Sequence, residues 1–84
     1  MSYQVVIARP AEKEMDALPD DIHRRVTARI LALEDDPRPP GAKKLTGRNE
    51  YRVRVGHYRV LYRVDDPSRL VTVVAVGHRR EVYR

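Results

Sequence analysis

The chain has 84 residues, a net charge of +5 and no cysteine. A domain of this length buries a small core, and the lack of cysteine excludes a disulfide framework and thiolate metal sites. No segment approaches the ~20 apolar residues of a membrane-spanning helix, and "MSYQVVIARP" does not resemble a secretory signal. We therefore expect one cytosolic domain over residues 1–84.

The charge is unevenly distributed along the chain. Residues 1–42 hold six basic and eight acidic side chains, a net of −2, whereas residues 43–84 hold eleven and four, a net of +7. Arginine predominates over lysine in the second half, and its planar guanidinium suits bidentate binding of phosphate. This half predicts an anion-binding surface, with nucleic acid as the expected target. Basic residues that only keep a small protein soluble are the alternative.

The first part of the chain predicts one strand and two helices. The β-branched segment "YQVVIA", residues 3–8, precedes Arg9-Pro10, a pair typical of a helix start. Up to Pro19, apolar residues recur at helical spacing: Ala11, Met15 and Leu18. A second helix is expected from Asp20 or Asp21, either of which can cap it. Its apolar stripe consists of Ile22, Val26, Ile30 and Leu33.

The second half predicts a loop and then three strands. The stretch "DPRPPGAKKLTGRNE" has the composition of a loop. The strands are "YRVRV", then "YRVLYRVD" after a tight Gly56-His57 turn, then "LVTVVAVGH" after a turn at "DPSR". We expect an antiparallel meander whose last strand is central and covered on both faces. The predicted class is α+β, in the order β-α-α-β-β-β, with a helical hairpin packed on a small antiparallel sheet.

Arginine alternates with apolar residues in the first two of these strands. Arg52 and Arg54 lie in one strand and Arg59 and Arg63 in the next, so each strand has a basic face and an apolar face. Like charges opposite one another on a sheet are destabilising, so an anion is expected to offset the repulsion. The alternative is that these are solvent-facing residues whose aliphatic stems cover the sheet.

Other basic and aromatic residues flank the strands. Tyr83 is expected to stack on an unpaired base, a contact worth about 1–3 kcal/mol, or to anchor the C-terminus on the sheet. Further substrate-binding candidates are Lys43, Lys44, His78 and Arg80.

Three segments in order resemble the RelE/ParE superfamily of type II toxin–antitoxin toxins, and more closely its RelE branch. They are "LPDDIHRRVTARILALEDDPRPPGAKKLTG", "YRVRVGHYRVLYRVDD" and "VTVVAVGHRREVY". The resemblance implies a helical pair on an antiparallel sheet and, for the RelE branch, cleavage of mRNA in the ribosomal A site. It also implies a cognate antitoxin that covers or distorts the basic face, with operator DNA bound only through the toxin–antitoxin complex.

The resemblance also implies roles for individual residues. Arg59 would contact the scissile phosphate, and Arg79 would act on the phosphate or the leaving group. Arg52 and Arg54 stand where the best-known members have lysines, which weakens any general-base role at these positions. Tyr83 would stack on the substrate or help to activate its 2′-hydroxyl.

The chemistry expected is attack of the 2′-hydroxyl on the adjacent phosphate, without a metal or other cofactor. Guanidinium groups suit the charge that develops in the transition state, but arginine, with a pKa above ~12, is a poor general base. The candidate proton carriers are His57, His78, Glu81 and Tyr83. Such weak acid–base equipment predicts that the ribosome supplies the substrate geometry.

Two other functions stay open at this point. A ParE-like toxin shares the fold but inhibits DNA gyrase, and a non-catalytic module would bind nucleic acid through the basic face. A gyrase inhibitor would not need the whole set of candidate catalytic residues together, namely Arg52, Arg54, Arg59, Arg79 and Tyr83.

Overall fold

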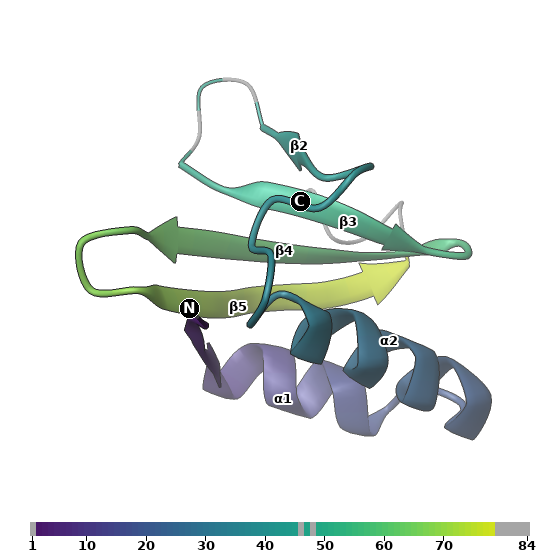
Figure 1. The fold of residues 1–84 in the computed structure, drawn as a ribbon. Coiled ribbons are helices and arrows are strands. Elements are labelled where there is room, and N and C mark those ends of the chain that lie inside the picture. The colour runs from purple at the N-terminus through teal and green to yellow at the C-terminus, as the bar shows by residue number, and fades with distance from the viewer. Residues whose placement is uncertain (1, 46, 48, 79–84) are drawn as a thin grey trace.

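The computed structural model describes residues 2–45, 47 and 49–78 of the chain. Within them the elements follow one another as β1 (Gln4–Ile7), α1 (Arg9–Asp16), α2 (Asp20–Ala32), β2 (Lys43–Lys44), β3 (Tyr51–Val55), β4 (Tyr58–Asp65) and β5 (Leu70–His78). Both helices lie on one side of the sheet (Figure 1). The predicted α+β class, with a helical pair on a sheet, is confirmed.

The strands form one sheet in the order β1-β5-β4-β3-β2. β3, β4 and β5 make the predicted antiparallel meander. The sheet as a whole is mixed, because β1 pairs with β5 in parallel, residue 4 opposite residue 70 and residue 7 opposite residue 73. The chain that joins these two parallel strands runs through both helices and through β2, β3 and β4. The predicted loop also contains β2, which pairs with the start of β3.

The two helices begin as the sequence suggests but with different capping. Pro10 lies in the first turn of α1, where its missing N–H costs nothing. Pro19 is the N-cap of α2 and no side chain caps the helix, so the prediction that Asp20 or Asp21 caps it was wrong. The two carboxylates lie in the first turn, where the helix dipole favours negative charge. In the described residues, no helix is long and apolar enough to cross a membrane.

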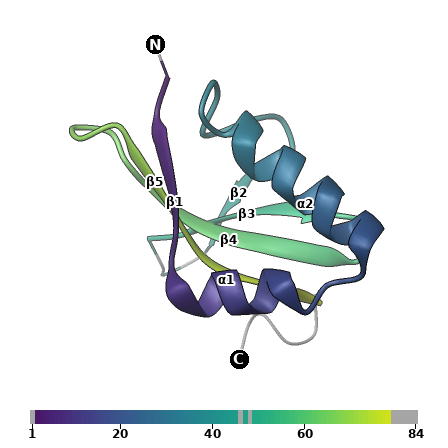
Figure 2. The same cartoon turned by 90° about the horizontal axis from the view of Figure 1, so that it is seen from below.

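The core lies between the helices and one face of the sheet (Figure 2). α1 packs mainly against β5 and α2 against β3. The buried cluster consists of Ala11, Met15, Val26, Ile30, Leu33, Val53, Val55, Val60, Tyr62, Val71, Val73 and Val76. The predicted apolar stripes of both helices therefore face the sheet. β5 is an interior strand as predicted, but Leu70 and Thr72 on its second face are only partly buried, so that face is not fully covered.

A side chain of α1 completes the hydrogen bonding of β5 where β1 ends. β1 reaches only as far as Ile7, opposite Val73. Beyond this point, the backbone N–H of Val76 donates to Oε1 of Glu14 at 2.8 Å. The carboxylate thus replaces the neighbouring strand for a backbone group that would otherwise lack a protein acceptor on that edge.

Candidate nucleic-acid interface

The strand arginines lie on the face of the sheet that is turned away from the helices. The register places Lys43, Arg52 and Leu61 side by side across β2, β3 and β4. In the next row on the same face, Arg54 is directly opposite Arg59. We call this surface the basic face. The predicted alternation is confirmed, since the valines between these arginines are fully buried in the core.

The centre of the basic face is apolar. Leu61 is 1% exposed and does not belong to the core cluster beneath the helices. Its neighbours across the strands are Arg52 and Ala75, and Arg52 is itself partly buried. This arrangement fits a covering role for the stem of Arg52.

One hollow lies at the hairpin end of the basic face. Its volume is about 270 Å³, and it is lined by Arg54, Gly56, His57 and Arg59. Gly56 has φ = 61°, a backbone conformation that glycine adopts without strain, so β3 and β4 are joined by only two residues. Two guanidinium groups and an imidazole, with no carboxylate among the described lining residues, make this hairpin hollow suitable for an anion.

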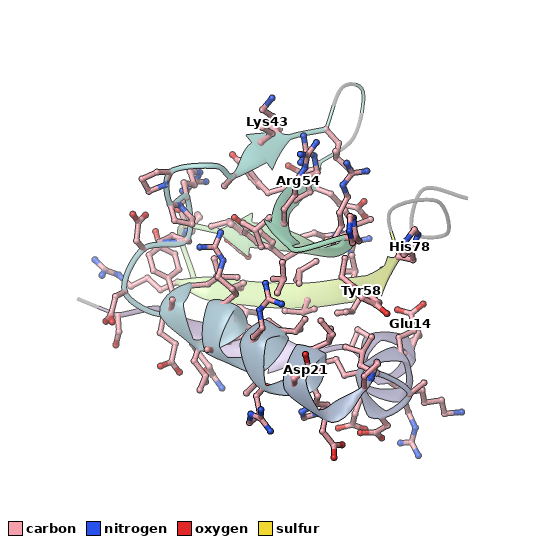
Figure 3. All side chains as sticks on the ribbon, turned by 90° about the vertical axis from the view of Figure 1, so that its right-hand side faces the viewer. Glu14, Asp21, Lys43, Arg54, Tyr58 and His78 are labelled. Atoms are coloured by element: carbon pink, nitrogen blue, oxygen red, sulfur yellow. The ribbon has the colours of Figure 1, made fainter. Side chains whose placement is uncertain are left out.

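A second hollow lies at the outer edge of β3. Its volume is about 290 Å³, and its lining is formed by Arg29, Gly41, Lys43, Arg52 and Arg54. β2 pairs only with the first two residues of β3, so beyond them this edge hollow opens beside α2. Lys43 and Arg54 project on the side of the sheet away from the helices (Figure 3). Arg54 lines both hollows.

The opposite end of the basic face is electrically more balanced. Arg63 forms a salt bridge of 3.5 Å with the largely buried Glu50. The hollow beside it, about 440 Å³, includes Asp65 and Asp66 in its lining. Arg63 therefore lies in a neutralised environment with acidic neighbours.

Two predicted substrate-binding residues lie elsewhere. His78 is opposite Tyr58 in the register, and therefore on the helix side of the sheet. Its ring lies 5.8 Å from that of Tyr58, edge to face, and stacks at 6.3 Å on His57 (Figure 3). His78 thus contacts a residue of the hairpin hollow but does not line it. Lys44 pairs with Tyr51 and lines neither hollow.

Several predicted residues lie outside the described part of the chain, namely Arg79, Arg80, Glu81 and Tyr83. The structure adds Arg29, which the sequence interpretation did not single out. Its only sequence signal is the i, i+4 spacing from Arg25, which places both on one flank of α2. A Cβ at Gly56 would lie 3.6 Å from the guanidinium of Arg25, so this flank extends to the hairpin turn.

A different arginine cluster ties the N-terminus to the start of β3. Arg38 donates to both carboxylate oxygens of Asp66, at 3.1 and 3.0 Å, and to the hydroxyl of Tyr51 at 3.0 Å. The hydroxyl of Tyr3 donates to Asp66 at 2.6 Å. We call these four residues the Arg38 clamp. The hydrogen bonds from Arg38 and Tyr3 lower the pKa of Asp66.

The family model described as "ParE toxin of type II toxin-antitoxin system, parDE" matches residues 5–83. The chain belongs to this toxin family. Within the wider RelE/ParE superfamily, the toxin is similar to Toxin RelG of Mycobacterium tuberculosis. The two are 33% identical over 88 aligned residues, which cover 100% of this chain and 99% of RelG.

Solved structures of RelE-like proteins resemble the toxin over most of its length. The RelBE2 toxin–antitoxin complex from M. tuberculosis has a TM-score of 0.84 at 29% identity, with 94% of this chain and 100% of the other covered. The archaeal RelE–RelB complex from Pyrococcus horikoshii has a TM-score of 0.84 at 30% identity, with 98% and 100% covered. The toxin is therefore a type II toxin with RelE-like relatives, and the predicted resemblance to the RelE branch is confirmed.

Proposed function

We propose that this toxin is an endoribonuclease that cleaves mRNA on the ribosome. The observation that carries the proposal is the hairpin hollow, where Arg54 and Arg59 face each other across two strands beside His57. Opposed like charges destabilise a sheet, and none of the described residues that line the hollow is acidic. A phosphate of RNA would offset the repulsion and accept hydrogen bonds from both guanidinium groups.

The reaction is an internal transfer of the phosphate. The oxygen of a ribose 2′-hydroxyl attacks the adjacent phosphorus while the bond from phosphorus to the 5′-oxygen breaks. The products are a 2′,3′-cyclic phosphate and a 5′-hydroxyl end, so a proton leaves the attacking oxygen and another reaches the leaving oxygen. Negative charge accumulates on the non-bridging oxygens in the transition state. Arg54 and Arg59 are placed to stabilise that charge, a contribution worth roughly 10²–10³ in rate for each such donor.

His57 is the proton carrier that the hollow favours. Arginine stays protonated at physiological pH, whereas an imidazole can take and give a proton near neutrality. Of the two candidate proton carriers that the structure describes, His57 lines the same hollow as both arginines, and His78 stacks against its ring. We assign His57 a proton-transfer role and His78 a positioning role. Arg79 and Tyr83 keep the roles that the family resemblance implies.

We expect cleavage to depend on the ribosome because the hollow alone does not hold the RNA in the geometry for attack. Among its described lining residues the hollow offers one imidazole as a proton carrier, and side chains on a single face do little to force a flexible RNA into an in-line geometry. A ribosome that holds the codon in place can supply this geometry, and such positioning contributes several kcal/mol to catalysis in other systems. Localisation in the cytoplasm is part of the same proposal.

Primer extension on a translated mRNA tests the proposal. After a short pulse of toxin synthesis, cuts within codons should be visible for the wild type and lost in Arg59→Ala. Arg24→Ala is the matched control, because Arg24 is exposed on α2 and lines neither hollow. Cuts should also disappear when translation is blocked. Equal cleavage of the same RNA without ribosomes would contradict the dependence on translation.

The ParE description of the matching family favours a second candidate, inhibition of DNA gyrase. A gyrase inhibitor does not need arginines converging on one hollow, so this target is the alternative rather than the conclusion. Purified toxin would be added to gyrase and relaxed plasmid. Loss of supercoiling, together with intact mRNA in the primer-extension experiment, would replace the ribonuclease with the gyrase function.

A cognate antitoxin is the proposed protein partner. The similar RelBE2 and archaeal RelE–RelB structures are both toxin–antitoxin complexes. The basic face offers an acidic antitoxin segment the same charges that it offers RNA. Co-expression with the adjacent antitoxin gene should yield a stable complex and abolish mRNA cleavage. Full cleavage by the purified complex would contradict neutralisation by this partner.

A further inference from the structure

The edge hollow is a second concentration of positive charge, and the proposed chemistry uses only its Arg54. Of the five described residues that line it, four are cationic, namely Arg29, Lys43, Arg52 and Arg54, and none is acidic. In the described part of the chain, none of these four forms a salt bridge, whereas Arg38 and Arg63 each do. The protein therefore gathers these charges from α2, β2 and β3 around one volume without neutralising them.

The two hollows are adjacent because they share a side chain. Arg54 lines both of them, so two anions bound there would lie on either side of one guanidinium. A guanidinium has five N–H donors in a planar fork and can serve two phosphate groups at once. Successive phosphates of a single RNA strand are linked anions of this kind. A pair of isolated anions would gain nothing from the shared residue.

The open edge of β3 gives an RNA strand a route between the hollows. β2 pairs with Arg52 and Tyr51 only, so no strand of the described sheet lies beside the end of β3 on its outer side. Arg29 reaches the edge hollow from α2. A backbone that leaves the hairpin hollow can therefore pass over this edge and still meet positive charge.

We propose that the edge hollow binds the phosphate next to the scissile phosphate, and that Arg29 is a phosphate-binding residue supplied by α2. The inference rests on the proposed function, since it takes the hairpin hollow as the seat of the scissile phosphate. The ligand class is single-stranded RNA recognised through its backbone. The recognition is independent of sequence, because phosphate contacts carry no base information.

Binding of a 2′-O-methylated uridine trinucleotide to the purified toxin tests the inference without cleavage or ribosomes. This probe has two phosphates and cannot undergo 2′-hydroxyl attack. Arg29→Ala should weaken binding about five- to tenfold and lower the slope of log K against log salt by about 0.7, the value for one phosphate of a single strand. Arg29→Lys should keep the slope. Arg24→Ala, from the same helix, should change neither quantity.

Two analogues of the trinucleotide identify the phosphate that Arg29 contacts. In each analogue, a neutral methylphosphonate replaces one of the two phosphates. The effect of Arg29→Ala should vanish when one of the two phosphates is neutral and persist when the other is. The inference would be overturned if the effect of Arg29→Ala persisted in both analogues, or if Arg29→Ala and Arg24→Ala bound the trinucleotide with equal affinity. Failure of the wild type to bind the trinucleotide at low salt would overturn it as well. Arg29-dependent binding of a glutamate oligopeptide but not of the trinucleotide would do so as well, since the hollow would then be a carboxylate site.

The outcome is separable from the ribonuclease proposal. Arg29-dependent binding with no cleavage of translated mRNA would reject the proposed function and keep the edge hollow as an RNA-phosphate site. Cleavage of translated mRNA, with no effect of Arg29→Ala on binding of the trinucleotide, would keep the proposed function and reject the edge hollow as a phosphate site. Amide NMR spectra of each variant would show that the fold is retained.

Discussion

Two arginines lie near the two ends of β3 and serve opposite purposes. Arg38 approaches the start of the strand, where it bonds Asp66 through both terminal nitrogens, bonds the hydroxyl of Tyr51, and lies 5.2 Å from the centroid of that ring. Arg54 lies near the end of the strand, opposite Arg59 and between two hollows whose described lining residues include no carboxylate. One arginine has its donors filled by the protein, and the other presents them to solvent.

The contrast shows that the net charge of a segment does not locate a binding surface. Arg38 lies in the acidic first half of the chain, and in the basic second half Arg63, on the same sheet face as Arg54, is balanced by Glu50. What distinguishes a binding candidate is the lack of a nearby carboxylate around converging guanidinium groups. Substitutions near one end of β3 can therefore be compared with substitutions near the other end.

The largest expected effect is on catalysis at the end of β3. Arg54→Ala should lower the rate of mRNA cleavage by about 10²-fold, because a donor to the transition-state charge is removed. The thermal unfolding midpoint should stay constant or rise, since the repulsion with Arg59 is relieved. Cleavage in a reconstituted translation reaction and calorimetry would measure the two quantities. A large fall in the midpoint would mean that Arg54 is a structural residue like Arg38.

A buried hydroxyl beside the Arg38 clamp should matter for stability only. Tyr62 is 0% exposed, and its hydroxyl donates to the carbonyl oxygen of Pro37 at 2.7 Å. Tyr62→Phe leaves that carbonyl without its donor and should cost about 1–2 kcal/mol of unfolding free energy, measured by urea unfolding. Tyr58→Phe is the control, because no hydrogen bond of its hydroxyl is found in the described residues. Equal losses in both variants would refute the assignment.

The Arg38 clamp itself should contribute less, because it is exposed. Arg38→Ala should lower the thermal unfolding midpoint by about 2–4 °C, a size typical of a surface ion pair with good geometry in a small domain. The cleavage rate should match the wild type, which makes this variant the mirror image of Arg54→Ala. A cleavage defect in Arg38→Ala, with the midpoint unchanged, would reverse the roles assigned to the two arginines.

The smallest expected effect is on stability at low pH. The pKa of Asp66 is lowered by its hydrogen bonds to Arg38 and Tyr3, so its stabilising contribution is complete above its ordinary pKa of about 4 and is lost as the pH falls through the lowered value. As the pH falls below about 4, the unfolding midpoint of the wild type should therefore drop more steeply than that of Arg38→Ala. Parallel curves for the two proteins would show that the clamp does not set the acid sensitivity.

Local patterns predicted most of the fold. Helical spacing identified the faces of α1 and α2 that carry Met15 and Val26, and alternation identified the buried valines of β3 and β4. The parallel pairing of β1 with β5 and the two-residue β2 were missed. Both depend on contacts between segments distant in sequence, and a pair such as Lys43–Lys44 carries no strand signal of its own.

The candidate site could be predicted only in part, for a similar reason. Arg52, Arg54 and Arg59 share a face because of a period of two, which the sequence displays. Arg29 joins them only through the packing of α2 against β3. Lys43 and Lys44 are neighbours in a strand, so their side chains lie on opposite faces of the sheet. The Arg38 clamp joins residues 3, 38, 51 and 66, and no local pattern links these positions.

The pairing of the first strand with the last has a consequence for how the toxin is made. Residues 4–7 find their partners in residues 70–73, so β1 cannot take its place in the sheet until those residues have been synthesised. Contacts of such long sequence separation slow the folding of small domains. In a nascent toxin, the first strand to be made therefore waits for the last described strand before the sheet is complete.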